Sequence, residues 1–359
     1  MINLKKVVIY LSLFLIFLIP KDIYAITNTA KSSIVMDLNG GRVLYEKNAD
    51  EKRLIASITK IMTAVLAIES ERLDEVVTAG DEVLTMYGTS IYIQKGEKMS
   101  LRDLVYGLML RSGNDAAVVI ANYLCDNEEE FVKLMNEKAK EIGMTNTTFE
   151  NCHGLDEETQ NYSTARDMAI LTKYAYQLEE YRKISGTKEH TVKTEDKTYL
   201  WYNRNKLLTE YEYCTGGKNG YTPSAGKTLV TTSKKDNLEI VVVTLYDNDE
   251  YNNHRRLADY AFETYQNYLL VDKDNFSITD DNINGTAYIK ESFSYPLSES
   301  ETKKVKIVAG IDLSIGTGKI GTVKVTLDSK ELKSIPIYLK EEEKKEGFFS
   351  RLLSRLLNR

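Results

Sequence analysis

The pattern of apolar and polar positions predicts a β-hairpin followed by a buried helix near the start of the folded chain. Residues 33–45 contain two short apolar runs on either side of an Asn-Gly-Gly sequence at 39–41, which is typical of a hairpin turn. At 57–69 the pattern changes, and apolar side chains occupy almost every side of a helix. A helix with so little polar surface is buried, so we expect it in the core.

Further along the chain, the same reading predicts more helices and a second hairpin. The predicted helices lie at 101–110, 116–124, 163–176 and 254–268, and the two β-rich runs lie at 227–233 and 238–246. Helices between and around hairpins favour an antiparallel sheet covered by helices. We therefore predict an α/β (α+β) layered body, which we place at residues 26–271.

The pattern after this body is almost entirely one of short strands. Runs at 304–309, 321–327 and 335–339 are rich in β-branched residues, and the second alternates polar and apolar side chains as a half-buried strand does. We predict a small all-β domain at 272–341. No pattern within it indicates chemistry.

Both ends of the chain differ from the folded body. Two lysines, an apolar run at 7–19 and a small residue, Ala25, follow the order of a secretory signal peptide, predicted at 1–25. The run is shorter than the ~20 residues of a membrane span, although a retained N-terminal anchor is the alternative. Within the tail predicted at 342–359, apolar pairs recur every four residues from 348 onward, opposite Ser and Arg. This pattern favours an amphipathic helix at the membrane surface, the alternative being a helix packed on the protein itself.

Composition narrows the classes of function. The chain has 359 residues, of which 42% are hydrophobic, and its net charge of -6 argues against a nucleic-acid partner. Three scattered cysteines are too few for a disulfide framework or a metal cage. We expect no metal and no cofactor, in an exported protein peripheral to the outer face of the cytoplasmic membrane.

The first candidate for chemistry is Ser57-Ile58-Thr59-Lys60. A serine and a lysine three residues apart share one face of a helix. A lysine held among apolar side chains has a lowered pKa, so Lys60 can accept a proton from Ser57. At a helix start, the macrodipole favours an oxyanion near the serine. A single Ser-x-x-Lys sequence is nevertheless common by chance.

Two further segments carry suitable groups. Ser112-Gly113-Asn114 lies between two apolar helices, where a hydroxyl can relay a proton and an amide can hold a substrate. In the second segment, Lys218-Asn219-Gly220-Tyr221, the lysine can pair with a carboxylate and the glycine allows a ligand close to the backbone. Taken alone, each of the two segments could also be an ordinary turn.

The order of the three segments is more informative than any one of them. Ser-x-x-Lys, Ser-x-Asn and Lys-x-Gly elements occur in this order in penicillin-binding proteins and class A β-lactamases. The chain resembles the low-molecular-mass penicillin-binding proteins, the serine D-Ala-D-Ala carboxypeptidases. The segments that carry this resemblance lie at 30–69, 111–117, 153–156, 162–169, 203–208 and 220–226.

The resemblance implies a mechanism and assigns roles within it. Ser57 would attack the carbonyl between the two terminal D-alanines of a peptidoglycan stem peptide, with Lys60 as general base and Ser112 as proton relay. Asn114 would hold the substrate backbone, and Lys218 would bind the terminal carboxylate. Asn219 and Gly220 belong to the same substrate-binding strand. The backbone N–H groups of Ser57 and Tyr221 would form the oxyanion hole, and β-lactams would acylate Ser57.

Two departures from the family pattern leave alternatives open. The family has threonine where this chain has Asn219, a longer and planar hydrogen-bonding group. It often has an arginine where this chain has Glu250, although Arg255 and Arg256 are close in sequence. A catalytically impaired wall-binding or scaffold protein is therefore the main alternative. A β-lactamase is a second alternative, which would need a positioned glutamate for fast deacylation.

Overall fold

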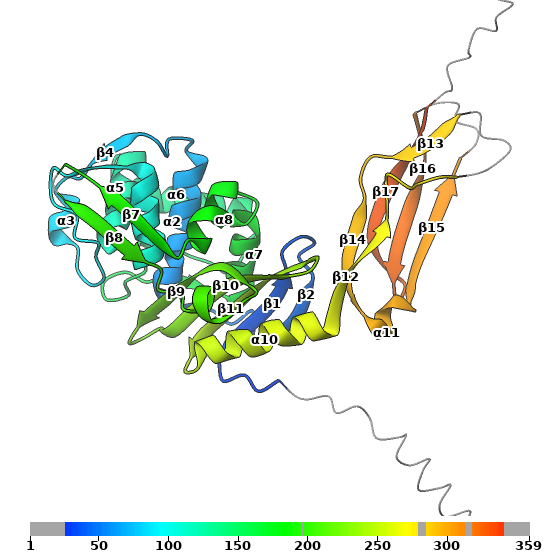
Figure 1. Ribbon diagram of the computed structural model, residues 1–359, viewed down its shortest axis with the longest axis horizontal. Helices are drawn as coiled ribbons and strands as arrows, with labels where there is room; N and C mark the ends of the chain where they lie inside the picture. The colour runs from blue at the N-terminus through cyan, green and yellow to red at the C-terminus, as the bar shows by residue number, and fades with distance from the viewer. Residues whose placement is uncertain (1–25, 196, 279–284, 313–317, 341–359) are drawn as a thin grey trace, which may run out of the picture.

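The computed structural model describes residues 26–195, 197–278, 285–312 and 318–340. Its centre is an antiparallel sheet of five strands in the order β2-β1-β11-β10-β9 (Figure 1). Their bounds are Ser32–Asp37 (β1), Val43–Lys47 (β2), Cys214–Thr222 (β9), Gly226–Lys235 (β10) and Leu238–Asp247 (β11). Both predicted hairpins are present, and β9 pairs with β10 at one edge of the sheet.

Most helices cover one face of this sheet and build the main core around α2, which is almost wholly buried. The helical elements of this layer are η1 (Ala56–Thr59), α2 (Lys60–Glu69), α3 (Glu82–Thr85), α4 (Leu101–Tyr106), η2 (Gly107–Arg111), α5 (Asn114–Leu124), α6 (Glu128–Glu141), α7 (Ala165–Ala175) and α8 (Glu179–Gly186). The opposite face packs against α10 (Glu250–Thr264), which buries Leu257, Ala258 and Ala261. The short α9 (Leu207–Glu210) lies outside the main core, and its Glu210 pairs with Arg255 of α10 at 2.6 Å. The predicted arrangement, an antiparallel sheet covered by helices, is confirmed.

Short two-stranded ribbons complete the body. These are β3 (Arg53–Leu54) with β6 (Tyr162–Ser163), β4 (Val76–Thr78) with β5 (Lys98–Ser100), and β7 (Glu189–Lys193) with β8 (Thr198–Tyr202). The β7–β8 ribbon packs Tyr199 and Trp201 against the core while Leu200 and Tyr202 face solvent. The sequence analysis did not identify this alternation.

The helix predicted at 254–268 is wrong at both ends. Helix α10 begins at Glu250 and ends at Thr264, and the chain then becomes extended as β12 (Tyr265–Val271). The apolar residues Tyr265, Tyr268 and Leu269 continue the helical spacing of α10. Pairing of β12 with β14 (Phe293–Ser298) makes this segment extended instead.

The C-terminal strands form two sheets with a core of their own. Strands β12 and β14 make one, and β13, β17, β16 and β15 make the other in that order. The remaining bounds are Thr286–Ile289 (β13), Glu299–Thr302 (α11), Val305–Ile311 (β15), Gly318–Leu327 (β16) and Lys330–Lys340 (β17). Their buried residues include Val325, Ile335 and Ile337. The boundary expected at 271/272 remains a prediction, although β12 already pairs within this region.

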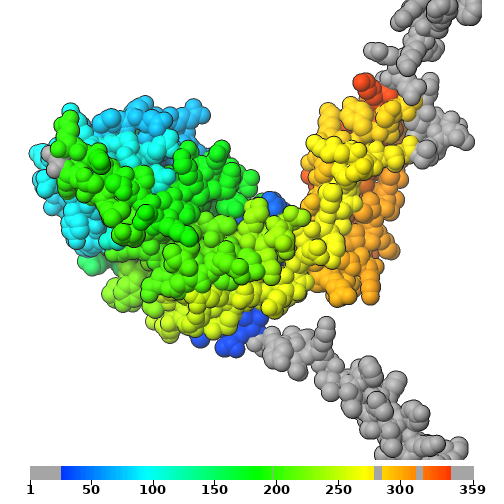
Figure 2. All heavy atoms as spheres, in the orientation of Figure 1, coloured from blue at the N-terminus to red at the C-terminus, as the bar shows by residue number. Residues whose placement is uncertain are grey.

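Arg42 and Tyr265 link the first hairpin to the C-terminal strands, since the hydroxyl of Tyr265 on β12 donates to the carbonyl of Leu44 on β2 at 3.3 Å. Arg42, just before β2, lies between the rings of Tyr265 and Tyr295, at 5.1 Å and 5.0 Å from their centroids. It also donates to the carbonyl of Pro296 and to Oε1 of Glu301 at 2.5 Å. The rest of the connection is the run from α10 into β12, which forms a narrow waist between the two parts (Figure 2).

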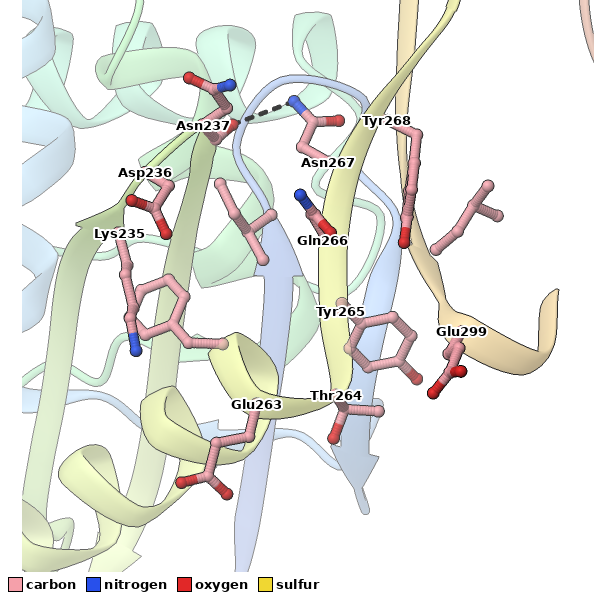
Figure 3. Close-up of a pocket in the computed structure, with 13 residues that line it drawn as sticks. Lys235, Asp236, Asn237, Glu263, Thr264, Tyr265, Gln266, Asn267, Tyr268 and Glu299 are labelled. Atoms are coloured by element: carbon pink, nitrogen blue, oxygen red, sulfur yellow. Dashed lines mark hydrogen bonds between the residues drawn. The ribbon is translucent and has the colours of Figure 1, made fainter. Parts of the chain in front are cut away.

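A cavity of about 540 Å³ lies near this waist, between the β10–β11 turn and the start of β12 (Figure 3). Asn267 crosses it and donates from Nδ2 to the carbonyl of Asn237 at 3.0 Å. No candidate site residue lines it. The predicted signal peptide and tail lie outside the described residues. Within those residues, no helix combines the length and apolar character needed to cross a bilayer.

Candidate active site

Ser57 lies in a short 3-10 turn that leads directly into α2. The preceding residue, Ala56, has a left-handed backbone (φ +49°) and is buried. Such strain in a non-glycine residue is sustained only where the surroundings enforce it, and it is frequent at active sites. One turn later, Lys60 is fully buried, and its Nζ donates to Oγ of Ser57 at 3.1 Å.

Ser112 and Asn114 approach this pair from the loop between η2 and α5. The π-helical turn η2 ends at Ser112, which is also left-handed (φ +65°) and buried. Nζ of Lys60 donates to Oδ1 of Asn114 at 2.8 Å. The other end of that amide, Nδ2, donates to the carbonyl of Tyr87 at 2.7 Å. This bond fixes which end of the Asn114 side chain faces the lysine.

Lys218 reaches the same site from the edge strand β9. It is 1% exposed, and its Nζ donates to Oγ of Ser112 at 3.0 Å and to the carbonyl of Asn219 at 2.7 Å. The next residue but one, Gly220, allows β9 to approach Ser57 closely. A Cβ at Gly220 would lie 2.8 Å from the backbone N of Ser57. The structure therefore brings all three sequence motifs together around Ser57.

The surroundings of the site lower the pKa values of its two lysine amines. Burial lowers the pKa of Lys60 to about 7, and Arg204 adds to this effect while Cys152 and Asp115 oppose it. Burial, with Lys60 and Arg204, also lowers the pKa of Lys218. A lysine with a pKa near neutrality can act as a general base.

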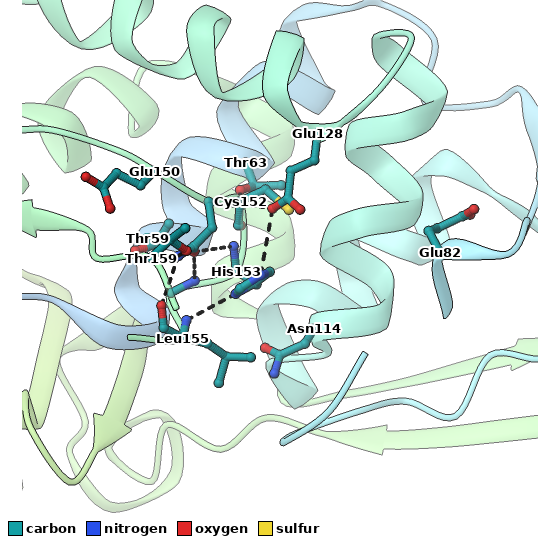
Figure 4. A network of polar contacts seen from close by, with 12 residues as sticks. Thr59, Thr63, Glu82, Asn114, Glu128, Glu150, Cys152, His153, Leu155 and Thr159 are labelled. Atoms are coloured by element: carbon teal, nitrogen blue, oxygen red, sulfur yellow. Dashed lines mark hydrogen bonds and ion pairs between the residues drawn. The ribbon is translucent and has the colours of Figure 1, made fainter. Parts of the chain in front are cut away.

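A third contact of Lys60 comes from a segment to which the sequence analysis gave no role. Nζ of Lys60 donates to the carbonyl oxygen of His153. His153 lies in the loop between α6 and β6, and Figure 4 shows its side chain. The following residue, Gly154, has φ +90°, and a Cβ there would lie 2.1 Å from the carbonyl oxygen of Ala56. The His-Gly pair was visible in the sequence, but only the fold shows that it touches the turn that carries Ser57.

Asp115 is a second residue to which the sequence analysis gave no role. It is 1% exposed and accepts from the backbone N–H groups of Ile91 and Ile93, each at 3.0 Å, and from the hydroxyl of Ser90. It thereby fixes the loop whose Tyr87 carbonyl holds Asn114. Its position directly after the Ser-x-Asn element is the one feature of the sequence that could have drawn attention to it.

The two departures from the family pattern, Asn219 and Glu250, lie on β9 and at the start of α10. Tyr221 is 64% exposed, and its register partner Lys227 forms an ion pair with Glu250 at 2.9 Å. The two nearby arginines have other partners. Arg255 pairs with Glu210 at 2.6 Å and Arg256 with Asp249 at 3.0 Å. Neither replaces the arginine expected at position 250.

Two absences concern only the described part of the chain. It contains no group of three or more His, Cys, Asp or Glu side chains that could hold a metal ion. Its three cysteines, Cys125, Cys152 and Cys214, are free thiols.

A serine beside a buried lysine, facing a second lysine on the edge strand of a helix-covered sheet, defines the penicillin-binding class of serine acyl-transfer enzymes. Solved structures agree with this class. The D-alanyl-D-alanine carboxypeptidase DacD from Francisella tularensis matches with a TM-score of 0.69 and 27% identity, over 91% of this chain and 97% of that one. Penicillin binding protein 5 from Haemophilus influenzae matches with a TM-score of 0.74 and 25% identity, over 88% and 98%. The predicted fold class is confirmed.

The chain belongs to the D-alanyl-D-alanine carboxypeptidase family, peptidase family S11, whose model matches residues 21–249. It is 32% identical to D-alanyl-D-alanine carboxypeptidase DacF of Bacillus subtilis, over 90% of this chain and 88% of that protein. It is 31% identical to DacC of Escherichia coli, over 90% and 86%. The chain is thus a serine peptidase, and the predicted family and enzyme class are confirmed.

Proposed function

We propose that this enzyme removes the terminal D-alanine from peptidoglycan stem peptides through an acyl-enzyme on Ser57. Lys60 in its neutral form accepts the hydroxyl proton as Oγ attacks the carbonyl carbon between the two D-alanines. The backbone N–H groups of Ser57 and Tyr221 stabilise the oxyanion. When the C–N bond breaks, Ser112 passes a proton to the leaving amine and D-alanine departs.

Deacylation and substrate binding use the same groups. Water, activated by Lys60, attacks the ester carbonyl and restores the Ser57 hydroxyl. Lys218, with Asn219 and Gly220 on the same strand, binds the terminal carboxylate, and Asn114 holds the peptide backbone. A β-lactam acylates Ser57 by the same attack, but its leaving amine stays tethered to the acyl group.

One observation carries this proposal above the others. Nζ of Lys60, whose pKa is lowered to about 7 chiefly by burial, lies 3.1 Å from Oγ of Ser57. A nucleophile and base within hydrogen-bond reach, with the base held by further acceptors, are what nucleophilic catalysis requires. Asn114 and His153 supply those acceptors.

The wild-type protein should release D-alanine from a peptide ending in D-Ala-D-Ala, and Asn219→Thr should raise kcat/KM. A hydroxyl at this position is shorter than the amide and suits a carboxylate, so we expect a gain of about 3- to 10-fold, equivalent to one hydrogen bond of ordinary strength. Released D-alanine measures the effect. Asn219→Ala is the control and should fall below wild type.

The alternative, a catalytically impaired scaffold protein, predicts a different result in the same assay. A wild-type protein that binds a fluorescent penicillin covalently but releases no D-alanine would support this alternative. Glu250 and the engaged arginines are its structural basis, because they leave the carboxylate end of the site without the arginine that the family often has there.

We further propose that the enzyme is exported and acts outside the cytoplasmic membrane, where its substrate lies. Residues 1–25 would act as the signal peptide and 342–359 as an interfacial anchor. The amphipathic pattern of the tail supports this part of the proposal.

Deletion of residues 346–359 should move the protein from the membrane fraction to the soluble fraction after cell lysis. The apolar half of the tail helix provides the buried surface that holds it to the bilayer. Immunoblotting of both fractions measures the distribution. An unchanged membrane share would show that another segment is the tether.

A further inference from the structure

One of the three acceptors of Nζ of Lys60, the carbonyl of His153, lies on a loop, not on a helix or strand. His153 is in the segment 151–155, between α6 and β6. Its position decides whether Nζ of Lys60 points at Oγ of Ser57. A misplacement of about 1 Å can lower an enzymatic rate about 100-fold. The contacts that hold this loop therefore matter to the proposed reaction.

Part of the loop is fixed by neutral side chains. The Oδ1 atom of Asn151 accepts from the backbone N–H groups of His153 at 3.2 Å and Gly154 at 2.6 Å. On the other side, the hydroxyl of Thr63 on α2 donates to the carbonyl of Cys152 at 2.6 Å. These bonds leave the N–H of Cys152 and the imidazole of His153 to be satisfied elsewhere.

One carboxylate meets both of these groups. Glu128, the first residue of α6, accepts from the backbone N–H of Cys152 at 2.9 Å, and the same Oε1 atom lies 3.7 Å from Nε2 of His153 (Figure 4). Nδ1 of His153 accepts from the N–H of Leu155 at 3.1 Å. The proton of the neutral imidazole therefore lies on Nε2, facing Glu128.

We propose that Glu128 is a positioning residue for the general base. Its carboxylate holds the Cys152–His153 segment so that the His153 carbonyl stays on Nζ of Lys60. This inference rests on the proposed function. It adds to that function a residue that is outside the three motifs and on a different helix.

The charged and titratable groups around the pair all bear on its pH dependence. Facing Lys60 are Cys152 and His153 from the loop, Asp115 from α5, Arg204, and Lys218 from β9. Burial, followed by Lys60, lowers the pKa of His153 to about 3, so the imidazole is neutral. Burial and then Glu128 raise the pKa of the Cys152 thiol, so it is uncharged too.

In the wild type, the rate constant for acylation by a fluorescent penicillin should rise with pH through a midpoint near the Lys60 pKa of about 7, because only the neutral amine accepts the proton. Glu128→Ala should lower the maximal rate constant about 10- to 100-fold. It should also move the midpoint to lower pH, since a carbonyl hydrogen bond favours the charged amine and its loss lowers the pKa further. Glu128→Gln keeps an acceptor oxygen and should stay within about 3-fold of wild type.

Glu129→Ala is the matched control. Glu129 is in the same helical turn but is exposed and paired with Lys133 at 3.1 Å, so rate and midpoint should be unchanged. Should Glu128→Ala fail to fold, as judged by thermal melting, Glu128→Asp takes its place, because its carboxylate is one methylene short of Cys152. We expect a lower rate and a lower midpoint from it as well.

Two results would overturn the inference. One is a folded Glu128→Ala or Glu128→Asp protein with the wild-type rate and midpoint. The other is a lower rate with an unmoved midpoint, which indicates only a smaller folded fraction. Wild-type protein that is never acylated overturns the proposed function together with this inference, so the two failures are distinguishable.

Discussion

Replacement of Ser57 by alanine should abolish covalent labelling by a fluorescent penicillin and all release of D-alanine. In the proposed mechanism, the acyl group bonds to Oγ of Ser57 and to no other atom. We expect at least a 10⁴-fold loss, on the order of the effect of removing a nucleophile in other serine hydrolases. Denaturing gel fluorescence measures the label. The change removes one hydroxyl that accepts from Lys60, so the melting temperature should change little.

The control for this substitution is Ser70→Ala. Ser70 caps the far end of α2, where its hydroxyl donates to the carbonyl of Ala67 at 2.7 Å, and it is remote from the three motifs. That variant should label as wild type does. Labelling that persists in Ser57→Ala would exclude Ser57 as the nucleophile.

Replacement of Gly154 by alanine should lower the acylation rate constant at least about 100-fold. The new Cβ would lie 2.1 Å from the carbonyl oxygen of Ala56 and 3.0 Å from the backbone N of Ser57. Both are backbone atoms, so no side-chain rotation relieves the clash, and the nucleophile's turn must shift. The strained φ of +90° should also reduce the free energy of unfolding by about 1–3 kcal/mol.

Gly143→Ala separates the two effects. Gly143 has nearly the same backbone conformation, φ +88°, but a Cβ there would meet no atom within 4 Å. Its unfolding free energy should fall by about 1 kcal/mol while acylation stays normal. Stopped-flow acylation and thermal melting of both variants provide the test. Normal acylation by Gly154→Ala would show that the turn tolerates the shift.

The sequence was sufficient to predict the groups of the site because the family motifs are local. Ser57 and Lys60 share one turn, and the segments at 112–114 and 218–221 were recognised by their order along the chain. Their convergence is now visible in the bonds of Lys60 to Asn114 and of Lys218 to Ser112. The catalytic roles of these residues stay predictions.

What the sequence could not supply were contacts set by tertiary packing. The left-handed backbones of Ala56 and Ser112 have no signal in residue type, because both residues normally avoid that region. The bond from Lys60 to His153 joins positions 93 residues apart. The carboxylate of Glu128 was one of three consecutive glutamates, and only the fold distinguishes it from its two exposed neighbours.

The error at the end of α10 has a similar origin. The apolar spacing of residues 265–269 continues that of the helix, but the chain there is extended because it pairs with β14, which follows more than twenty residues later. Secondary structure that depends on a distant partner is not encoded in the local pattern.

Arg42 gives the molecule a mechanical property that neither part has alone. Its flat guanidinium is inserted between two tyrosine rings and tied to Pro296 and Glu301 on the far side of the waist. Tilting the C-terminal strands away from the body would break the contacts of Arg42 with Tyr295, Pro296 and Glu301 together with the hydrogen bond from Asn267 to Asn237. The angle between the two parts is therefore set by side chains on both sides of the waist acting together.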